Sequence, residues 1–152
     1  LRLHGRGVLA LLAQGASEEA LALALVAALA SGNSLAVLAQ GPALTLAQTL
    51  QQRLRQAGLP AALLQVQQGG SQALVGLLAD ARLAGVVLAA QDVATERALW
   101  RQMATDRGAI RPLITAAEVA QASQQYRFSA EQTLTINTAA AGGNEALLAG
   151  MH

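Results

Sequence analysis

The sequence predicts an α/β fold built on a parallel sheet of about five strands that is flanked by helices. Two observations predict the sheet. Short apolar runs alternate with longer stretches whose leucines recur at helical spacing, and glycine, proline or serine stands at most of the changes between them. Strands that alternate with helices of ten to fifteen residues form parallel sheets with helical crossovers. A third observation, the loss of this rhythm after residue 115, predicts a different C-terminal end.

The first strand and helix have the clearest signals. Residues 7–12 form an apolar run that ends before Gln14 and Gly15, as is typical of a buried parallel strand. Ser17 predicts the N-cap of a helix that begins with two glutamates, and Gly32 predicts its end.

The same unit then repeats. Strands are predicted over residues 34–39 and 61–66, with a helix over residues 42–56 between them. The next helix is expected to begin at a capping Ser71 and to run to about residue 83, where Gly85 would end it.

Two more strands complete the predicted sheet. They occupy residues 86–89 and 110–114, and a helix over residues 92–107 connects them. Pro112 lacks an amide hydrogen, so we expect the last strand at or near an edge of the sheet.

The last third follows another pattern. Residues 116–123 predict a short helix, and the polar and apolar alternation of residues 127–137 predicts an antiparallel β-ribbon, or flap. Such a ribbon is not stable alone and needs a surface to lie on. A tail of small residues follows over residues 138–144. We therefore expect a Rossmann-like unit over residues 1–115, with residues 116–152 as a helix, flap and tail.

The composition excludes several classes of protein. With 53% hydrophobic and 12% charged residues, the 152-residue chain suits one folded core rather than disorder. Its formal net charge of +1 and its scattered arginines give no reason to expect a nucleic acid partner. The longest apolar run, residues 20–30, is shorter than the roughly 20 residues that cross a bilayer.

The cysteine count and the first residues indicate the setting of the chain. Cysteine is absent, which excludes disulfides and a thiol nucleophile and fits a reducing cytoplasm. The first residues lack the pattern of a signal peptide, and the sequence opens in mid-pattern without methionine. We therefore expect a piece of a longer cytoplasmic chain.

The predicted strand ends offer little to a nucleotide. Residues 14–17 (QGAS) lack the G-x-G-x-x-G spacing of a dinucleotide-binding turn, although the following helix N-terminus would attract an anion. Residues 69–71 (GGS) leave two alternatives, a small anion nest or a plain turn with a cap. Residues 91–92 lack the glycine that close approach of a phosphate requires.

Catalytic and metal-binding candidates are equally scarce. His4 and His152 stand at opposite ends, so a metal site would need both to converge with a carboxylate. The acidic residues are scattered, and Ser71 and Ser123 have no recognisable His and Asp partners. The sequence therefore predicts no catalytic, cofactor-binding or metal-binding residue and no cofactor in this chain.

Several segments resemble known families. Residues 28–35 (ALASGNSL) and 56–66 (QAGLPAALLQV) resemble the cofactor-binding half of the aldehyde dehydrogenase superfamily, in which helices end in Ala-Gly-Asn and Ala-Gly-Leu-Pro turns. Residues 134–144 (LTINTAAAGGN) resemble the terminal motif of the long forms of the proline utilization A (PutA) family, and residues 1–9 resemble the start of their last domain.

The resemblance implies a noncatalytic C-terminal domain of a multifunctional enzyme. The implied parent oxidises proline to glutamate with a flavin-dependent proline dehydrogenase and an NAD-dependent glutamate-semialdehyde dehydrogenase, which bind FAD and NAD. The domain is implied to cover the aldehyde dehydrogenase module of the same polypeptide or of a partner subunit, and to help close the tunnel between the two active sites. In family members that also repress transcription, it has been linked to membrane association.

Several residues also differ from those that an active aldehyde dehydrogenase would have at the same places, which agrees with a noncatalytic domain. The lysine expected after the second strand is replaced by Leu38 or Ala39, and the following glutamate by about Gly41. Residues 91–93 (QDV) replace the Gly-Ser-Thr turn, and their carboxylate would repel a pyrophosphate. Residues 1–115 thus resemble a degenerate cofactor-binding fold.

Three functions follow as hypotheses. The first is a structural and interaction domain that packs through its flap and tail, with self-association through the flap or a disordered tail as alternatives. The second is a residual nucleotide-binding module. The third is docking at the inner face of the cytoplasmic membrane through Leu99, Trp100 and Met103, unless these side chains face the sheet. The residues expected at the packing interface are Leu134, Ile136, Asn137, Thr138, Ala139, Ala140, Ala141, Gly142, Gly143 and Asn144.

Overall fold

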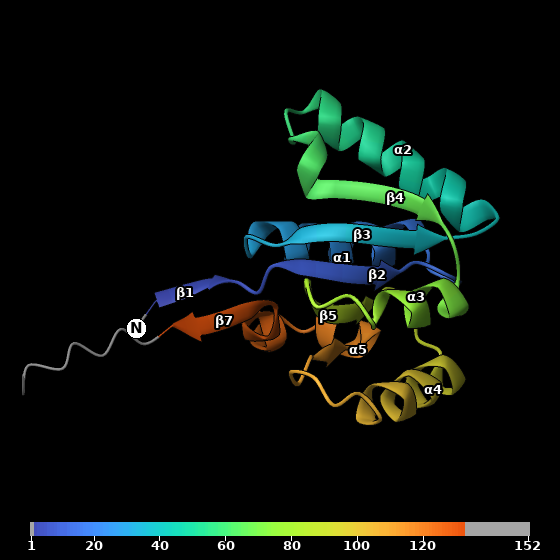
Figure 1. Ribbon diagram of the computed structural model, residues 1–152. Coiled ribbons are helices and arrows are strands. Elements are labelled where there is room, and N and C mark those ends of the chain that lie inside the picture. Colours follow the sequence, from blue (N-terminus) through green and yellow to red (C-terminus); the bar gives the residue numbers. More distant parts are fainter. Residues whose placement is uncertain (1, 133–152) are drawn as a thin grey trace, which may run out of the picture.

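The predicted parallel sheet is present in the computed structural model, which describes residues 2–132 (Figure 1). Its strand order is β4-β3-β2-β5-β6, and each neighbouring pair is parallel. The chain builds outward from β2 to β4 and then crosses to the other side of β2 to add β5 and β6. The strands are β2 (Val8–Leu12), β3 (Ser34–Ala39), β4 (Leu64–Gln68), β5 (Leu83–Leu88) and β6 (Leu113–Ile114).

Helices cover both faces of the sheet. The cluster on one face includes side chains of α1, α2, α5 and the 3₁₀ helix η2, and the cluster on the other includes side chains of α3 and α4. The predicted parallel sheet flanked by helices is therefore confirmed, with helices on both faces. The helical segments are α1 (Glu18–Ala30), α2 (Pro42–Gln56), η1 (Ala61–Leu63), α3 (Ser71–Leu77), α4 (Val93–Ala104), α5 (Ala116–Val119) and η2 (Ala122–Phe128).

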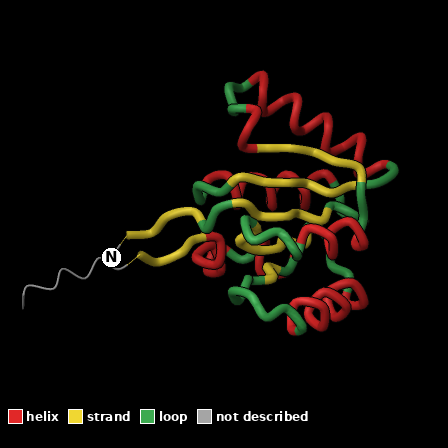
Figure 2. The backbone as a smooth tube through the Cα atoms, viewed as in Figure 1, coloured by secondary structure: helices red, strands yellow, loops and turns green. Residues whose placement is uncertain are grey.

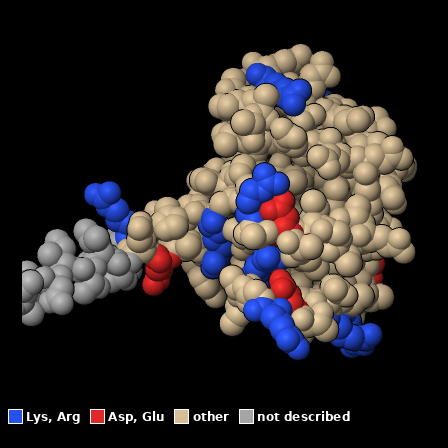
Figure 3. Space-filling model, in the orientation of Figure 1, with Lys and Arg blue, Asp and Glu red and all other residues tan. Residues whose placement is uncertain are grey.

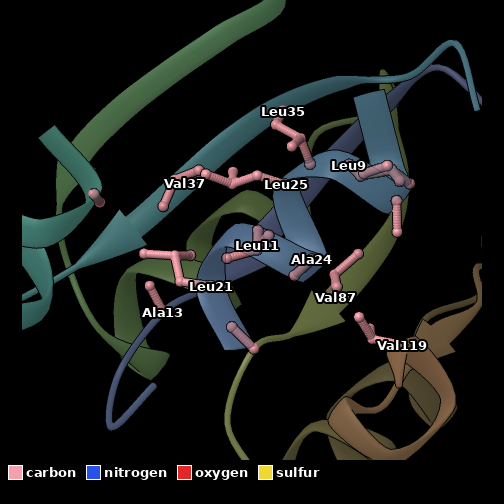
Figure 4. Close-up of a cluster of buried hydrophobic side chains, with 14 of the residues drawn as sticks. Leu9, Leu11, Ala13, Leu21, Ala24, Leu25, Leu35, Val37, Val87 and Val119 are labelled. Atoms are coloured by element: carbon pink, nitrogen blue, oxygen red, sulfur yellow. The ribbon is translucent and has the colours of Figure 1, made fainter. Parts of the chain in front are cut away.

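The larger core lies between α1 and the middle of the sheet (Figure 4). Leu21 and Leu25 of α1 share this cluster with Leu9 and Leu11 of β2, and all four are almost completely buried. Ala24 lies between the two α1 leucines on the helix, where its small side chain lets the helix approach the strands closely.

Local signals set the boundaries of the first two units. Ser17 Oγ accepts a hydrogen bond of 3.1 Å from the amide of Ala20, which confirms the predicted cap of α1. β3 and α2 match their predicted ranges residue for residue. Gly41 precedes α2 with φ of +55°, a conformation that favours glycine, and Pro42 opens the helix where its missing amide hydrogen costs nothing.

The third unit corrects the sequence-based boundaries. Residues 61–63 form a 3₁₀ turn, so β4 begins three residues later than predicted. Helix α3 ends at Leu77 instead of residue 83, because Asp80 organises a turn in which its side chain accepts a 2.9 Å hydrogen bond from the amide of Arg82. Gly85 does not end a helix. It lies inside β5, where a Cβ would stand 3.0 Å from Pro112 Cγ.

The last units are shorter than predicted. β6 is confirmed as an edge strand but keeps only two residues, and α4 ends at Ala104. Helix α5 is shorter than the predicted 116–123, because a 3₁₀ helix takes over at Ala122. Within residues 2–132, no helix combines the length and apolarity needed to cross a membrane.

An antiparallel ribbon projects from one end of the sheet, and Figure 2 shows its two strands side by side. They are β1 (Arg2–Gly5) and β7 (Ser129–Gln132), paired from Arg2 with Gln132 to Gly5 with Ser129. The predicted ribbon therefore exists, but its first strand comes from the N-terminal residues, for which no strand was predicted. Residues 127 and 128 of the predicted range belong to the 3₁₀ helix η2, and residues 133–137 lie outside the described residues.

Candidate functional site

The expected place for a ligand in this fold is a narrow crevice. Doubly wound sheets bind ligands beyond the carboxyl ends of the strands where the strand order turns back, here between β2 and β5. The crevice at this point encloses about 10 Å³, room for about one water molecule, against roughly 300–1,000 Å³ for pockets that enclose small molecules. Its lining residues in the described part of the chain are Leu12, Gln14, Leu88, Ala90, Asp92 and Thr95.

Asp92 occupies the helix N-terminus beside this crevice. Its Oδ1 accepts hydrogen bonds from the amides of Ala94 (3.0 Å) and Thr95 (3.2 Å), and its Oδ2 accepts one from the Thr95 hydroxyl (2.6 Å). The Thr95 hydroxyl, and then the Thr95 and Ala94 amides, lower the pKa of the Asp92 carboxyl. The donors that a phosphate would use are therefore already bound to an ionised carboxylate.

A wider hollow of about 430 Å³ lies at the N-termini of α1 and α2. Its lining includes Gln14, Gln40 and Pro42 but no charged residue, while two glutamates begin α1 nearby. Leu38 and Ala39, which stand where the resemblance expects a lysine, are buried in β3. The residues that line this hollow, together with Leu38 and Ala39, supply neither a cation for a phosphate nor a carboxylate for a ribose.

The turn after β4 is closely packed. Gly69 and Gly70 are both buried, and a Cβ on Gly70 would stand 3.1 Å from Gln40 Oε1. The side chain of Gln40 therefore fills the space in front of the turn. Gly70 is the N-cap of α3 and Ser71 is its first residue, so the predicted cap at Ser71 is wrong by one position.

The histidines provide no metal centre in the part of the chain that the structure describes. His4 lies on the ribbon, with its Nδ1 2.7 Å from the carbonyl oxygen of Gly5. No three His, Cys, Asp or Glu residues within 2–132 gather as metal ligands. His152 lies outside this range.

A buried polar side chain joins three segments of the chain at the base of the ribbon. The buried Asn33 donates from Nδ2 to the carbonyl oxygens of Ala28 (3.0 Å) and Phe128 (2.9 Å), and its Oδ1 accepts from the amide of Gly7 (3.3 Å). One side chain therefore joins the end of α1, the entry to β2 and the residue before β7.

Two further contacts fix the direction of the ribbon. A Cβ on Gly5 would stand 2.2 Å from the carbonyl oxygen of Gly32, so only glycine permits this approach of the two backbones. Arg6 Nε donates a 2.6 Å hydrogen bond to the carbonyl oxygen of Arg127. Arg127 in turn pairs with Glu118 at 3.1 Å and donates to the carbonyl oxygen of Leu113, also at 3.1 Å.

The ribbon itself is exposed. Its described residues are exposed or half-buried, and Leu3 keeps 66% of its surface in water. A two-stranded ribbon is marginal in water without further contacts. Within residues 2–132, the ribbon is thus held at its base while its strand residues are exposed or half-buried.

The structure describes the residues predicted for membrane contact but not those predicted for the packing interface. The predicted interface residues 134 and 136–144 lie outside the described residues. Leu99 is buried against the sheet, Met103 is half-buried on the same cluster, and Trp100 is 45% exposed. Leu99 and Met103 therefore take the alternative orientation, toward the sheet.

Sequence reasoning missed the role of Asn33 and the ribbon strand β1. The Ser-Gly-Asn turn was visible as part of a family resemblance, but its contact with Phe128 joins residues 95 positions apart. The four residues of β1 are too few to show a periodic pattern.

Comparisons with known proteins identify the fold. No protein-family model matches the chain, and no curated protein sequence matches it. Among solved structures, it is similar to a bifunctional proline utilization A (PutA) protein, with 26% identity and a TM-score of 0.62. A PutA variant from Bradyrhizobium japonicum gives 28% identity and a TM-score of 0.64. Each match covers 74% of this chain and 12% of the PutA chain.

A third similar structure is an NAD-dependent benzaldehyde dehydrogenase from Corynebacterium glutamicum, with 16% identity and a TM-score of 0.62. This match covers 74% of the present chain and 25% of the dehydrogenase. At such low identity it shows the shared aldehyde dehydrogenase fold alone. The chain is therefore a PutA-like domain in structure, and it spans a small fraction of the proteins that it resembles.

Proposed function

We propose that the chain is a noncatalytic domain of a longer proline-oxidising enzyme, in which it packs against the aldehyde dehydrogenase module. The observation that carries the proposal is the crevice between β2 and β5, which encloses about 10 Å³ and has Asp92 at the adjoining helix N-terminus. The narrow crevice and the carboxylate beside it support a role for the outer surface of the domain rather than for a bound coenzyme.

The ribbon supports a packing role. Its base is fixed by Asn33 and by the contact of Gly5 with Gly32, whereas its strands carry exposed backbone edges and an exposed Leu3. Exposed strand edges pair readily with other strands. The partner surface we propose is the dehydrogenase module of the same polypeptide or of a neighbouring subunit, where the domain helps to close a tunnel for the intermediate. FAD and NAD then bind to the other modules.

The test uses the full-length polypeptide that carries this chain. Deletion of residues 137–152 is expected to lower aldehyde oxidation or the transfer of the intermediate while proline oxidation stays largely intact. A Gly5→Val variant, which disturbs the base of the ribbon, should act in the same direction, and Gly76→Ala serves as a matched control because its Cβ meets nothing within 4 Å. Unchanged coupled activity in both altered proteins would refute the proposal.

The alternative of a residual nucleotide-binding module has a direct test. Calorimetry of the 152-residue chain with NAD should detect no binding tighter than about 100 μM, equivalent to about −5.5 kcal/mol. A Kd for NAD below about 100 μM, or turnover of an aldehyde by the purified chain, would restore the nucleotide hypothesis. Membrane docking through Leu99, Trp100 and Met103 gains no support, because Leu99 is buried and Met103 half-buried.

A further inference from the structure

A second surface lies between the end of α4 and the segment that returns to β6. It is a hollow of about 250 Å³, which we call the α4 hollow. Trp100 and Met103 of α4 line one side, and Ile110 of the returning segment lines another. The volume is below that of pockets for drug-sized molecules, roughly 300–1,000 Å³. It suits one or two inserted side chains.

The apolar residues of the α4 hollow are unusually accessible. Ile110 is completely exposed and Trp100 is 45% exposed, while Met103 packs partly on the core. Aromatic and aliphatic side chains that surround a concave site are typical of the centre of a protein interface. The exposed Ile110 therefore marks a surface whose burial by a partner would lower the free energy of the system.

The charges at the α4 hollow favour one kind of partner. Arg111, with 11% of its side chain exposed, pairs with Asp106 at 3.4 Å and donates to the carbonyl oxygen of Leu78, so the charge of Asp106 is already compensated. Arg101 and Arg107 stand next in sequence to lining residues and form no ion pair with any acidic side chain in residues 2–132. Figure 3 shows several arginines over the lower half of the molecule, where Figure 1 places α4.

We propose that the α4 hollow is a docking site for an acidic segment of another protein, which inserts one bulky apolar side chain between Trp100, Met103 and Ile110. Carboxylates beside the inserted side chain would face Arg101 and Arg107. The site is separate from the ribbon and from the β2–β5 crevice, and it does not depend on the function proposed above.

A concave site favours a protein over a lipid surface. Membrane-binding helices present a projecting apolar face that enters the headgroup region. In α4, Leu99 is buried and Met103 is half-buried, so this helix presents no such face. A side chain of a partner can enter the hollow, whereas a bilayer would meet only its rim.

The test uses Trp100, the only tryptophan of the chain, as the reporter. The probe is the synthetic peptide acetyl-Asp-Glu-Phe-Leu-Asp-Glu-amide, added to the 152-residue chain while Trp100 emission is recorded. We expect saturable binding with a Kd of about 100 μM or tighter. A peptide with Lys in place of every acidic residue and one with Ala in place of Phe and Leu should each bind at least about tenfold more weakly.

Two variants locate the binding. Ile110→Asp, at a fully exposed position that folding does not require to be apolar, should weaken binding of the acidic peptide at least about tenfold. Val26→Asp, at an exposed position on α1, is the matched control and should leave the Kd unchanged. Equal binding of the three peptides, an unchanged Kd in Ile110→Asp, or no binding at 1 mM would overturn the proposal.

Two other occupants would also overturn it. Vesicles of phosphatidylglycerol that shift Trp100 emission more strongly than the peptide would assign the hollow to a membrane. A wild-type chain that sediments as a dimer, while Ile110→Asp sediments as a monomer, would assign it to a second copy.

Discussion

The side-chain amide of Asn33 donates a 2.9 Å hydrogen bond to the carbonyl oxygen of Phe128, across 95 positions of the sequence. Asn33 is the only buried polar or charged residue in the described part of the chain. Because the Phe128 carbonyl immediately precedes β7, this bond ties the ribbon to the loop that begins β3. A buried polar group is costly to leave unpaired, so the contact specifies one position for the ribbon.

Replacing Asn33 should therefore destabilise the whole fold. Asn33→Ala leaves the Phe128 carbonyl and the Gly7 amide without their partner, at a cost of about 1–3 kcal/mol in the free energy of unfolding. Asn33→Asp, which keeps the size but places a charge against two carbonyl oxygens, should cost at least as much. Urea unfolding followed by circular dichroism measures both. If the Asp variant were as stable as the wild type, the network would not have the role assigned to it.

Gly5 should tolerate no side chain. A Cβ there would stand 2.2 Å from the Gly32 carbonyl oxygen, so Gly5→Ala must move one backbone segment and is expected to cost about 1–3 kcal/mol. Gly76→Ala, in a helix with open space around the new methyl group, should be neutral or stabilising by up to about 1 kcal/mol. Urea midpoints of the two variants provide the comparison. Similar midpoints would contradict the close contact.

Asp80 should make the stability of the fold depend on pH in acidic solution. Hydrogen bonds from the Arg82 side chain, and then from its amide, lower the pKa of Asp80 from 3.8 to about 2. A carboxyl whose pKa is lower in the folded than in the unfolded state stabilises the fold above the unfolded value and loses this effect as pH falls through the folded one. Asp80→Asn should therefore lower Tm at pH 6, and its difference from wild type should shrink between about pH 4 and pH 2.

Arg82→Ala supplies the control for Asp80. It removes the side-chain donor but leaves the carboxyl. In this variant, as in Asp80→Asn, Tm should therefore fall less steeply than in the wild type as the pH is lowered from about 4 to 2. An Arg82→Ala profile parallel to that of the wild type would exclude this pair as the cause.

Asp92 should act as a cap and not as a reactive group. Asp92→Ala removes the acceptor for two amides and one hydroxyl at the start of α4 and should lower Tm, whereas Asp92→Asn can still cap and should stay close to wild type at pH 7. Amide hydrogen exchange in the first turn of α4 would show the loss directly. Equal effects of Ala and Asn would mean that the charge, and not the cap, stabilises the helix.

Local chemistry determined much of the fold from the sequence. Ser17, Gly32 and the Gly41-Pro42 pair set the limits of α1 and α2, because capping and turn preferences act within a few residues. The same reasoning gave wrong limits for α3 and β5. The turn around Asp80 and Arg82 has no glycine or proline, and Gly85 looks like a helix end although packing against Pro112 places it in a strand.

The sequence by itself determined an alternating parallel α/β chain, the cap of α1, the range of α2 and the scarcity of chemical groups at the strand ends. Only the tertiary structure decided the strand order, the pairing of β1 with β7, the role of Asn33 and the α4 hollow. The physical reason is the separation along the sequence of the residues that interact. Caps and periodicity act between neighbours along the chain, whereas these features depend on contacts between segments that meet only after folding.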